Sequence, residues 1–245
     1  MTEPSTTQLL GDLESAAATV QAKAASLTDD DVRTPSALPG WSRGHVLAHI
    51  CGISDAMARQ LEYARRGEKI ELYDGGYEGR TRAIELAAGH SAAEHLGDLE
   101  RSLGRALDAF RGLGEADWSM PVAFRGGVVF DGGLALWREL VIHLTDLEVG
   151  RGPETWSRPF CEHLFRFLSA RVPDGLRLKL QPLGLPPVTM GSGEQSVSIN
   201  GMLTDIAAWL AGRTPSLGSL RATAAADGVD LPELLPWPSG TPAPK

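Results

Sequence analysis

Histidine and carboxylate side chains recur at four-residue spacing in two segments of the chain. In the first segment, His45 and His49 are four residues apart. In the second, Glu139 and His143 have the same spacing, and Asp146 follows three residues later. If both segments are helical, each pair lies on one face of its helix, with about 6 Å of rise between its members. Imidazole nitrogens and a carboxylate oxygen are ligands that bind a divalent metal ion such as zinc.

A glutamate beside the apolar stripe of a helix is expected to be partly buried, and its charge then needs a compensating cation. Glu139 and His143 share one side of their segment with Leu136 and Leu140. Burying an ionised carboxylate without a partner costs several kcal/mol, and a bound metal would offset that cost. Two histidines and one glutamate from two helices leave a fourth coordination position for water or substrate, as in catalytic zinc sites. The pattern therefore predicts a catalytic zinc site.

Simpler interpretations of these residues remain open at this point. A histidine on an amphipathic helix is commonly a satisfied core residue, and Glu139 with His143 could be a surface pair. The spacing of His45 and His49 lacks the intervening glutamate of the zinc-protease signature. Asp146 could be an acceptor that orients a ligand, or a helix-end charge. Three further histidines have no partner in the sequence and are predicted to be structural: His90, His95 and His163.

Helical periodicity dominates the first 150 residues. Apolar residues recur at three- and four-residue steps in four stretches, which are residues 7–24, 42–67, 78–113 with a weak point at 89–91, and 134–149. Ser42 is a suitable N-cap for the second stretch. The glycines of FRGGVVFDGG predict a turn or a short extended piece before the last stretch. Four long helices with short connections predict an antiparallel four-helix bundle over residues 1–150.

The pattern changes to a small α/β domain over residues 151–245. A helix is predicted at 161–170, followed by a strand in which apolar residues alternate from Leu176 to Leu180. VTM and SVSIN predict two short strands, 202–211 a buried helix closed by Gly212, and LRAT a last strand. The tail has five prolines in its last fourteen residues and is predicted to be irregular, with Trp237 as an anchor. The predicted fold class is α+β.

The composition excludes several classes of protein. The chain has 245 residues and a net charge of −8, and its densest basic cluster, at residues 65–69, contains a glutamate. Nucleic-acid binding, which needs a basic stripe, is therefore not expected. No apolar run is long enough to span a bilayer, and the acidic N-terminus does not resemble a secretory signal, so a cytoplasmic location is expected. Cys51 and Cys161 are predicted to be small buried hydrophobes rather than disulfide partners.

Two stretches carry a resemblance to a known family. LPGWSRGHVLAHICGISDAMARQLEYARRGE and WRELVIHLTDLEVG look like the metal-binding core of DinB-like four-helix bundles. Within that superfamily the chain most resembles the mycothiol-dependent maleylpyruvate isomerase family, in which a small α/β domain follows the bundle. The likeness extends over nearly the whole chain and includes NGMLTDIAAWLAGR.

The resemblance implies a particular ligand set. In the family one metal ion, usually zinc, is held by the second histidine of a GW-x-R-x-H-x-x-x-H element and by both residues of an E-x-x-x-H element. By position these ligands are His49, Glu139 and His143. His45 matches the first histidine of the element, which is not a ligand in the family.

The resemblance also implies functional arginines. Arg213, at the end of a helix in the second domain, matches an arginine that the family requires for catalysis. The alternative for Arg213 is a helix-end cation that neutralises the helix dipole. Arg80 or Arg82 matches another arginine that the family places near the bound thiol. Two positions depart from the family pattern: the neighbourhood of Gly52–Ser54 lacks the usual asparagine, and Glu71–Tyr73 replaces a proline–methionine–tyrosine run. The resemblance therefore extends further for the metal site than for the substrate.

Together with this resemblance, the observations predict a zinc-dependent enzyme that activates a low-molecular-weight thiol against a small electrophile. The resemblance implies that this thiol is mycothiol. The thiolate would add to an activated double bond, and Arg213 would meet the negative charge that develops. Expulsion of the thiol after bond rotation gives cis–trans isomerisation, whereas its retention gives S-transfer. The alternative is a non-enzymatic, zinc-containing regulatory or ligand-binding bundle. The expected partners are the thiol and the electrophile, with no nucleic acid or membrane, and the chain is expected to be a monomer or a homodimer.

Overall fold

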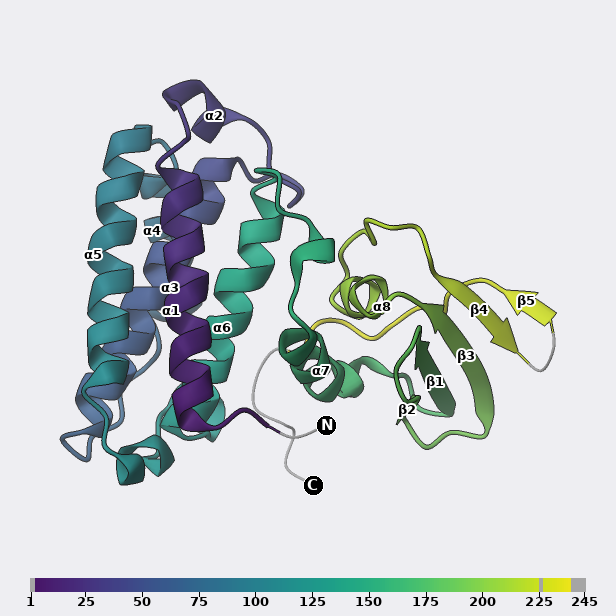
Figure 1. Ribbon diagram of the computed structural model, residues 1–245. Coiled ribbons are helices and arrows are strands. Elements are labelled where there is room, and N and C mark those ends of the chain that lie inside the picture. The colour runs from purple at the N-terminus through teal and green to yellow at the C-terminus, as the bar shows by residue number, and fades with distance from the viewer. Residues whose placement is uncertain (1–2, 225–226, 239–245) are drawn as a thin grey trace. The chain divides into compact units, whose positions relative to one another are not determined.

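The computed structural model describes residues 3–224 and 227–238, which form two compact units (Figure 1). The first unit is Pro4–Gly150, and the second contains the residues from Arg151 onward. The first is helical and the second combines helices with a five-stranded sheet, so the predicted α+β class is confirmed. Within the described residues, no helix is long and apolar enough to cross a membrane.

The first unit is built on four long helices. Each of α1 and α3 packs against both α5 and α6, so that the four helices enclose one core (Figure 1). The bundle helices are α1 (Thr6–Ala24), α3 (Arg43–Ala64), α5 (Ala92–Arg111) and α6 (Val129–Asp146), and the shorter helices are α2 (Asp29–Arg33) and α4 (Gly76–Ala87). Two 3₁₀ turns, η1 (Glu115–Ser119) and η2 (Phe124–Gly126), precede α6.

The helix beginnings follow local capping chemistry. The hydroxyl oxygen of Ser42 accepts a hydrogen bond from the backbone N–H of His45, which confirms Ser42 as the N-cap of α3. The ring Nδ1 of His45 in turn accepts the backbone N–H of Ser42. Thr28 caps α2 in the same way, and the acidic residues 29–31, which the sequence reasoning placed in a connection, form its first turn.

Two predicted helix boundaries are wrong. The stretch predicted at 78–113 is two helices, α4 and α5, which separate at the weak point that the sequence indicated. Helix α6 begins at Val129 rather than at residue 134, because Gly132 and Gly133 lie inside the helix. A Cβ atom on Gly133 would lie 3.0 Å from a methyl carbon of Leu9, so this glycine permits close packing of α6 on α1 rather than forming a turn.

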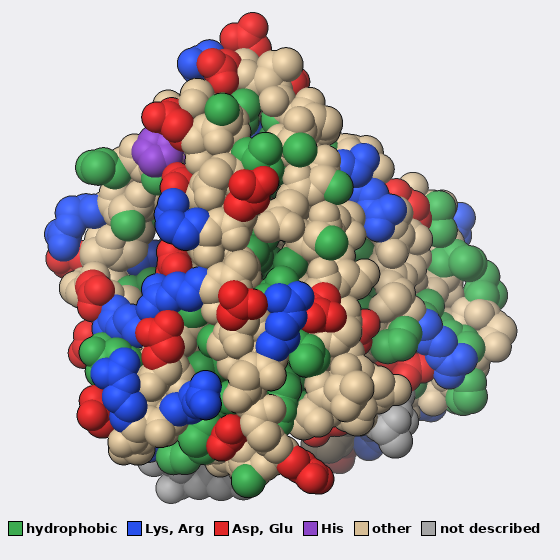
Figure 2. Space-filling model, turned by 60° about the vertical axis from the view of Figure 1, so that its left-hand side comes forward, with side chains coloured by type: hydrophobic (Ala, Val, Ile, Leu, Met, Phe, Trp, Pro, Cys, Tyr) green, Lys and Arg blue, Asp and Glu red, His purple; other side chains and the backbone are tan. Residues whose placement is uncertain are grey.

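Charged side chains on the outside of the bundle are of both signs. On the face shown in Figure 2, the described acidic and basic side chains are interspersed. Arg105 of α5 pairs with Asp55 and Glu62 of α3, at 3.3 and 2.8 Å. Arg111 pairs with Glu14 of α1 at 2.7 Å. Because the side chains of these pairs are partly exposed, each pair contributes only about 0.2–1 kcal/mol to stability.

The second unit combines two helices with a mixed sheet. The strand order is β2-β1-β3-β4-β5, in which β1 and β3 are parallel and the other neighbours are antiparallel. The four predicted strands are present, and β5 was not predicted. The elements are η3 (Pro153–Thr155), α7 (Arg158–Phe167), η4 (Leu168–Arg171), β1 (Leu176–Pro182), β2 (Val188–Met190), β3 (Gln195–Gly201), α8 (Leu203–Leu210), β4 (Arg221–Ala224) and β5 (Asp227–Val229).

The end of α8 and the tail agree with the sequence reasoning. Gly212 has a φ of +69°, and the backbone N–H of Arg213 donates to the carbonyl of Ala208 at 2.8 Å, which is the bonding of a glycine C-cap. The described part of the tail is irregular, and the ring centroid of Trp237 lies 5.6 Å from that of Phe167, so the predicted anchor is confirmed. Residues 239–245 of the predicted tail lie outside the described residues.

Candidate metal centre

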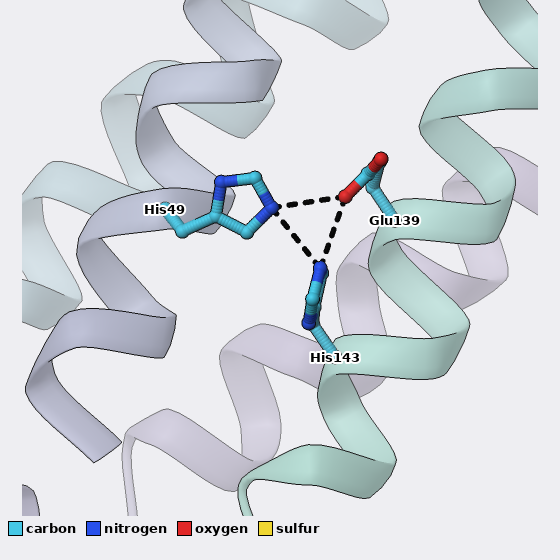
Figure 3. Close-up of side chains that lie close together, drawn as sticks. All are labelled: His49, Glu139 and His143. Atoms are coloured by element: carbon cyan, nitrogen blue, oxygen red, sulfur yellow. Dashed lines mark hydrogen bonds and ion pairs between the residues drawn. The ribbon is translucent and has the colours of Figure 1, made fainter. Parts of the chain in front are cut away.

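Three side chains from two helices of the bundle converge on one point (Figure 3). The Nε2 atom of His49, from α3, lies 2.9 Å from Oε2 of Glu139 and 3.0 Å from Nε2 of His143, both from α6. The third side of the triangle, from His143 Nε2 to Glu139 Oε2, is 3.0 Å. Among the described residues, this is the one group of three or more His, Cys, Asp or Glu side chains whose potential ligand atoms lie within 4.8 Å of one another.

The geometry and chemistry of the triangle fit a metal ion. Ligands about 2.0–2.1 Å from a tetrahedral zinc ion lie about 3.3 Å from one another, close to the three separations observed. Two imidazole nitrogens and one carboxylate oxygen are also a ligand type found in catalytic zinc sites. Three protein ligands leave one position of the tetrahedron for another molecule. The residues present therefore fit the metal that the sequence predicts.

Asp146 orients one member of the triangle. Its carboxylate is fully buried, and Oδ2 lies 2.8 Å from Nδ1 of His143. A carboxylate that accepts a hydrogen bond from the far nitrogen of a metal-binding histidine fixes the tautomer and the ring orientation. Of the two interpretations of Asp146 from the sequence, the structure places it as this acceptor.

Burial and mutual contact set the charges of the three groups. Burial, aided by His143, lowers the pKa of His49 to about 4, so its imidazole is neutral at pH 7. Burial disfavours the charged form of Glu139, but hydrogen bonds from His143 and His49 outweigh it and hold the carboxyl pKa well below its usual range. Burial also opposes protonation of His143, yet Asp146 and Glu139 raise its pKa to about 9. Without a metal, a proton on His143 thus supplies the positive charge between two carboxylates.

Arg80 is the one of the two predicted arginines that reaches the triangle. Its Nη2 lies 3.0 Å from Nδ1 of His49, and its guanidinium carbon lies 6.0 Å from the ring centroid of Trp41 and 5.8 Å from that of Tyr73. Burial raises the pKa of Tyr73 to about 12, so the phenol stays protonated. Arg82 is different, because its side chain is 71% exposed and pairs with Glu78 at 3.9 Å.

Other residues considered from the sequence lie elsewhere. His45 is outside the triangle, since its Nδ1 serves the start of α3 and its Nε2 lies 3.5 Å from Glu85. Arg213 follows α8 in the second unit, where its Nη1 donates to the carbonyl of Ala211 at 3.0 Å. Cys51 and Cys161 are buried, as predicted, and burial raises the pKa of each thiol to about 12.

The sequence reasoning gave no role to Trp41 and Tyr73. Trp41 belongs to the GW element that carries the family resemblance, and its ring centroid lies 5.8 Å from that of His49. For Trp41 the available signal was its position just before the N-cap of the helix that carries His49. For Tyr73 the signal was its place at the end of the Glu71–Tyr73 run, where the family pattern also has a tyrosine.

Comparison with known proteins finds matches to both units of the chain. A sequence model of the mycothiol maleylpyruvate isomerase N-terminal domain matches residues 13–148, and a model of the C-terminal domain of that isomerase matches residues 155–236. No curated protein gives a significant sequence match. The crystal structure of the mycothiol-dependent maleylpyruvate isomerase matches with a TM-score of 0.83 and 21% identity, over 96% of this chain and 99% of that one. A histidine-to-alanine mutant of that enzyme matches over the same shares, with a TM-score of 0.82 and 20% identity.

At this level of identity the structural likeness establishes the fold, while the two sequence models cover most of the chain. The chain therefore belongs to the mycothiol-dependent maleylpyruvate isomerase family.

Proposed function

We propose that the protein is a zinc-dependent enzyme that activates mycothiol for attack on a small electrophilic substrate. The observation that carries the proposal is the convergence of His49, Glu139 and His143, which offers three ligands and one open position. Zinc bound there would favour the thiolate form of a thiol in the open position, and thiolate is the nucleophilic form. Membership of the family supports mycothiol as that thiol.

The protein's own residues prepare the centre for this chemistry. A neutral His49 presents a lone pair, and the ionised Glu139 offsets part of the positive charge of the metal. Asp146 holds the ring of His143 in the orientation for binding. Neither cysteine can substitute for the external thiol, because a pKa of about 12 leaves each almost wholly protonated at neutral pH.

Addition of the thiolate to an activated double bond forms a C–S bond and moves the electron pair onto a conjugated carbonyl. A guanidinium can stabilise that oxyanion through two parallel hydrogen bonds, which is the role proposed for Arg213. The carbon–carbon bond that was double is now single, so rotation about it is free. Loss of the thiolate then restores the double bond with inverted geometry. We propose cis–trans isomerisation as the reaction. When the thiol is retained instead, the enolate carbon takes up a proton from water and the outcome is S-transfer.

The test joins metal content to thiol binding. The purified protein is expected to carry about one zinc ion per chain, measured by atomic spectroscopy. Mycothiol should raise the melting temperature of the metal-loaded protein and leave that of the chelator-stripped protein unchanged, because the thiol binds through the metal. Turnover of maleylpyruvate should then require both zinc and mycothiol. An equal thermal shift in the stripped protein, or a preparation that binds no metal, would contradict the proposal.

Replacing Asp146 should weaken metal binding without removing a ligand. Asp146→Ala is expected to lower zinc affinity about 10–100-fold, because the ring of His143 loses the acceptor that orients it. Asp146→Asn keeps a neutral acceptor and should lie between the wild type and the alanine variant. The measurement is competition with a chromogenic chelator.

Asp98 supplies a matched control for Asp146. Its Oδ2 lies 3.0 Å from Nδ1 of His90, so it forms a similar carboxylate–histidine pair away from the triangle. Asp98→Asn should leave zinc affinity unchanged. If Asp146→Ala matches the wild type in affinity, the orienting role is wrong.

A further inference from the structure

The contact between Arg80 and His49 has a hydrogen-bond polarity that conflicts with metal binding. A guanidinium has only N–H donors, so Nδ1 of His49 must be the acceptor of the 3.0 Å contact with Arg80. A neutral imidazole carries one N–H group, which then lies on Nε2. That Nε2 faces Glu139 and His143, so a continuous line of hydrogen bonds runs from the arginine through the histidine to the carboxylate.

Binding of a metal reverses this polarity. The Nε2 atom of His49 is the one that faces the other two ligands, so it is the atom that would coordinate. The remaining proton of the imidazole then lies on Nδ1, which becomes a donor. Two N–H donors cannot form a hydrogen bond with each other, and the cationic guanidinium would also face a ring bound to a dication. The Arg80–His49 contact and metal coordination by His49 are therefore mutually exclusive.

The helix that carries Arg80 is mostly exposed. Helix α4, which carries the arginine, has only one buried residue among its described residues, Ile84. The helix starts at two glycines with left-handed backbone, Gly75 and Gly76, at φ values of 70° and 63°. The residues just before these glycines are fastened to α3, since Asp74 pairs with Arg59 at 2.6 Å. Gly75 and Gly76 thus lie between α4 and a segment that is tied to α3.

Two aromatic rings already flank the guanidinium of Arg80. The rings of Trp41 and Tyr73 lie about equally far from it, at 6.0 and 5.8 Å, and both offer π faces that attract a cation. Keeping these two contacts would hold the arginine close to the open coordination position while its N–H donors are free of the histidine. There the donors suit an anionic group, such as a carboxylate, on a ligand of the centre.

We propose that Arg80 competes with the metal for His49, so that metal loading releases a guanidinium beside the centre and an empty centre keeps it bound. The proposal rests on the proposed function in one respect, the binding of metal by the triangle. Its consequence is that the apparent metal affinity of the wild type is reduced by the fraction of molecules in which Arg80 holds His49.

Metal affinity of Arg80 variants tests the competition directly. Arg80→Met removes the competing donors and keeps most of the aliphatic stem, so zinc and cobalt should bind about five- to tenfold more tightly than to the wild type. Arg80→Gln offers a neutral side chain with an acceptor oxygen, so tighter binding is expected here too. Arg82→Met is the matched control, because Arg82 lies two residues away on α4 with its side chain exposed, and should leave affinity unchanged. Dissociation constants come from competition with a chelator, and circular dichroism verifies that each variant is folded.

Hydrogen exchange gives a second measurement that does not depend on activity. In the wild type, zinc should speed backbone exchange in α4, because the helix loses its contact with His49. In Arg80→Met, exchange in α4 should not respond to zinc. Tighter binding in both Arg80 variants with no change in Arg82→Met supports the proposal. Unchanged or weaker binding in Arg80→Met, with metal still bound by the wild type, overturns it and leaves the proposed function standing. Loss of metal binding in all the proteins overturns both.

Discussion

Replacing Glu139 with glutamine is expected to lower zinc affinity by more than about 100-fold while the bundle stays folded. Glutamine has nearly the same shape but no charge, so it removes the one anionic side chain of the triangle. Removing a residue that only orients a ligand typically costs 10–100-fold in metal affinity, and loss of a ligand should cost more. Thiol-dependent turnover should be lost with the metal. The measurements are chelator competition, turnover with mycothiol, and circular dichroism.

The control for this variant is Glu85→Gln. Glu85 also lies beside a histidine, at 3.5 Å from Nε2 of His45, but its side chain is exposed and lies outside the triangle. Its replacement should leave both affinity and turnover unchanged. If Glu139→Gln keeps its zinc affinity within threefold of the wild type, Glu139 is not a ligand, and two histidines alone would have to account for the metal.

The residues of the triangle could be predicted from the sequence only within each helix, not between the two helices. The four-residue spacing of Glu139 and His143 places them on one face of α6, and the structure agrees. The choice of His49 over His45 is different, because both lie on the same face of α3. Here family resemblance supplied the choice, and the physical reason is now visible: the ring of His45 is held at the N-cap by Ser42.

The choice between Arg80 and Arg82 could not be made from the sequence either. Side chains two residues apart on a helix point in nearly opposite directions, so only one of the two arginines could face the centre. Which one does so depends on how α4 packs against α3, and α4 has little apolar pattern to determine this from the sequence. Ile84 is its one buried residue among those described, and that residue lies four positions from Arg80, on the same face.

The predicted start of α6 is wrong because its glycines were interpreted only as turn residues. Gly132 and Gly133 predicted a connection, yet both lie in α6. A Cβ atom on Gly133 would lie 3.0–3.5 Å from side chains of Leu9, Phe110 and Trp118. The close packing on α1 and α5 compensates for the low helix propensity of glycine. Packing partners far apart in sequence were therefore decisive, and a local pattern could not reveal them. By contrast, the alternation in β1 and the C-cap at Gly212 were predictable because both depend on neighbouring residues alone.

Replacing Arg213 with alanine should separate catalysis from helix capping. If Arg213 stabilises the negative charge that develops on the substrate, Arg213→Ala should lower kcat about 10²–10³-fold and leave zinc affinity unchanged. If it is a helix-end cation, the loss is the bond from Nη1 to the carbonyl of Ala211 and a dipole interaction of about 0.3–1 kcal/mol. In that case the melting temperature should fall slightly and kcat should not change.

Two further variants, Arg213→Lys and Arg221→Ala, distinguish the catalytic role of Arg213 from the capping role. Lysine keeps the charge that a helix end needs but lacks the planar fork of arginine. If Arg213 binds the substrate, Arg213→Lys should recover only part of the kcat that Arg213→Ala loses. If Arg213 caps the helix, Arg213→Lys should recover the full stability. Arg221 lies in the same unit and bonds to nearby backbone carbonyls, at Gly218 and Leu220, so its replacement reports the effect of losing an ordinary surface arginine. Equal kcat values for Arg213→Ala, Arg221→Ala and the wild type would assign Arg213 to the end of α8. The charge developing in the reaction would then have to be met by residues of the bundle, among which Arg80 already lies at the centre.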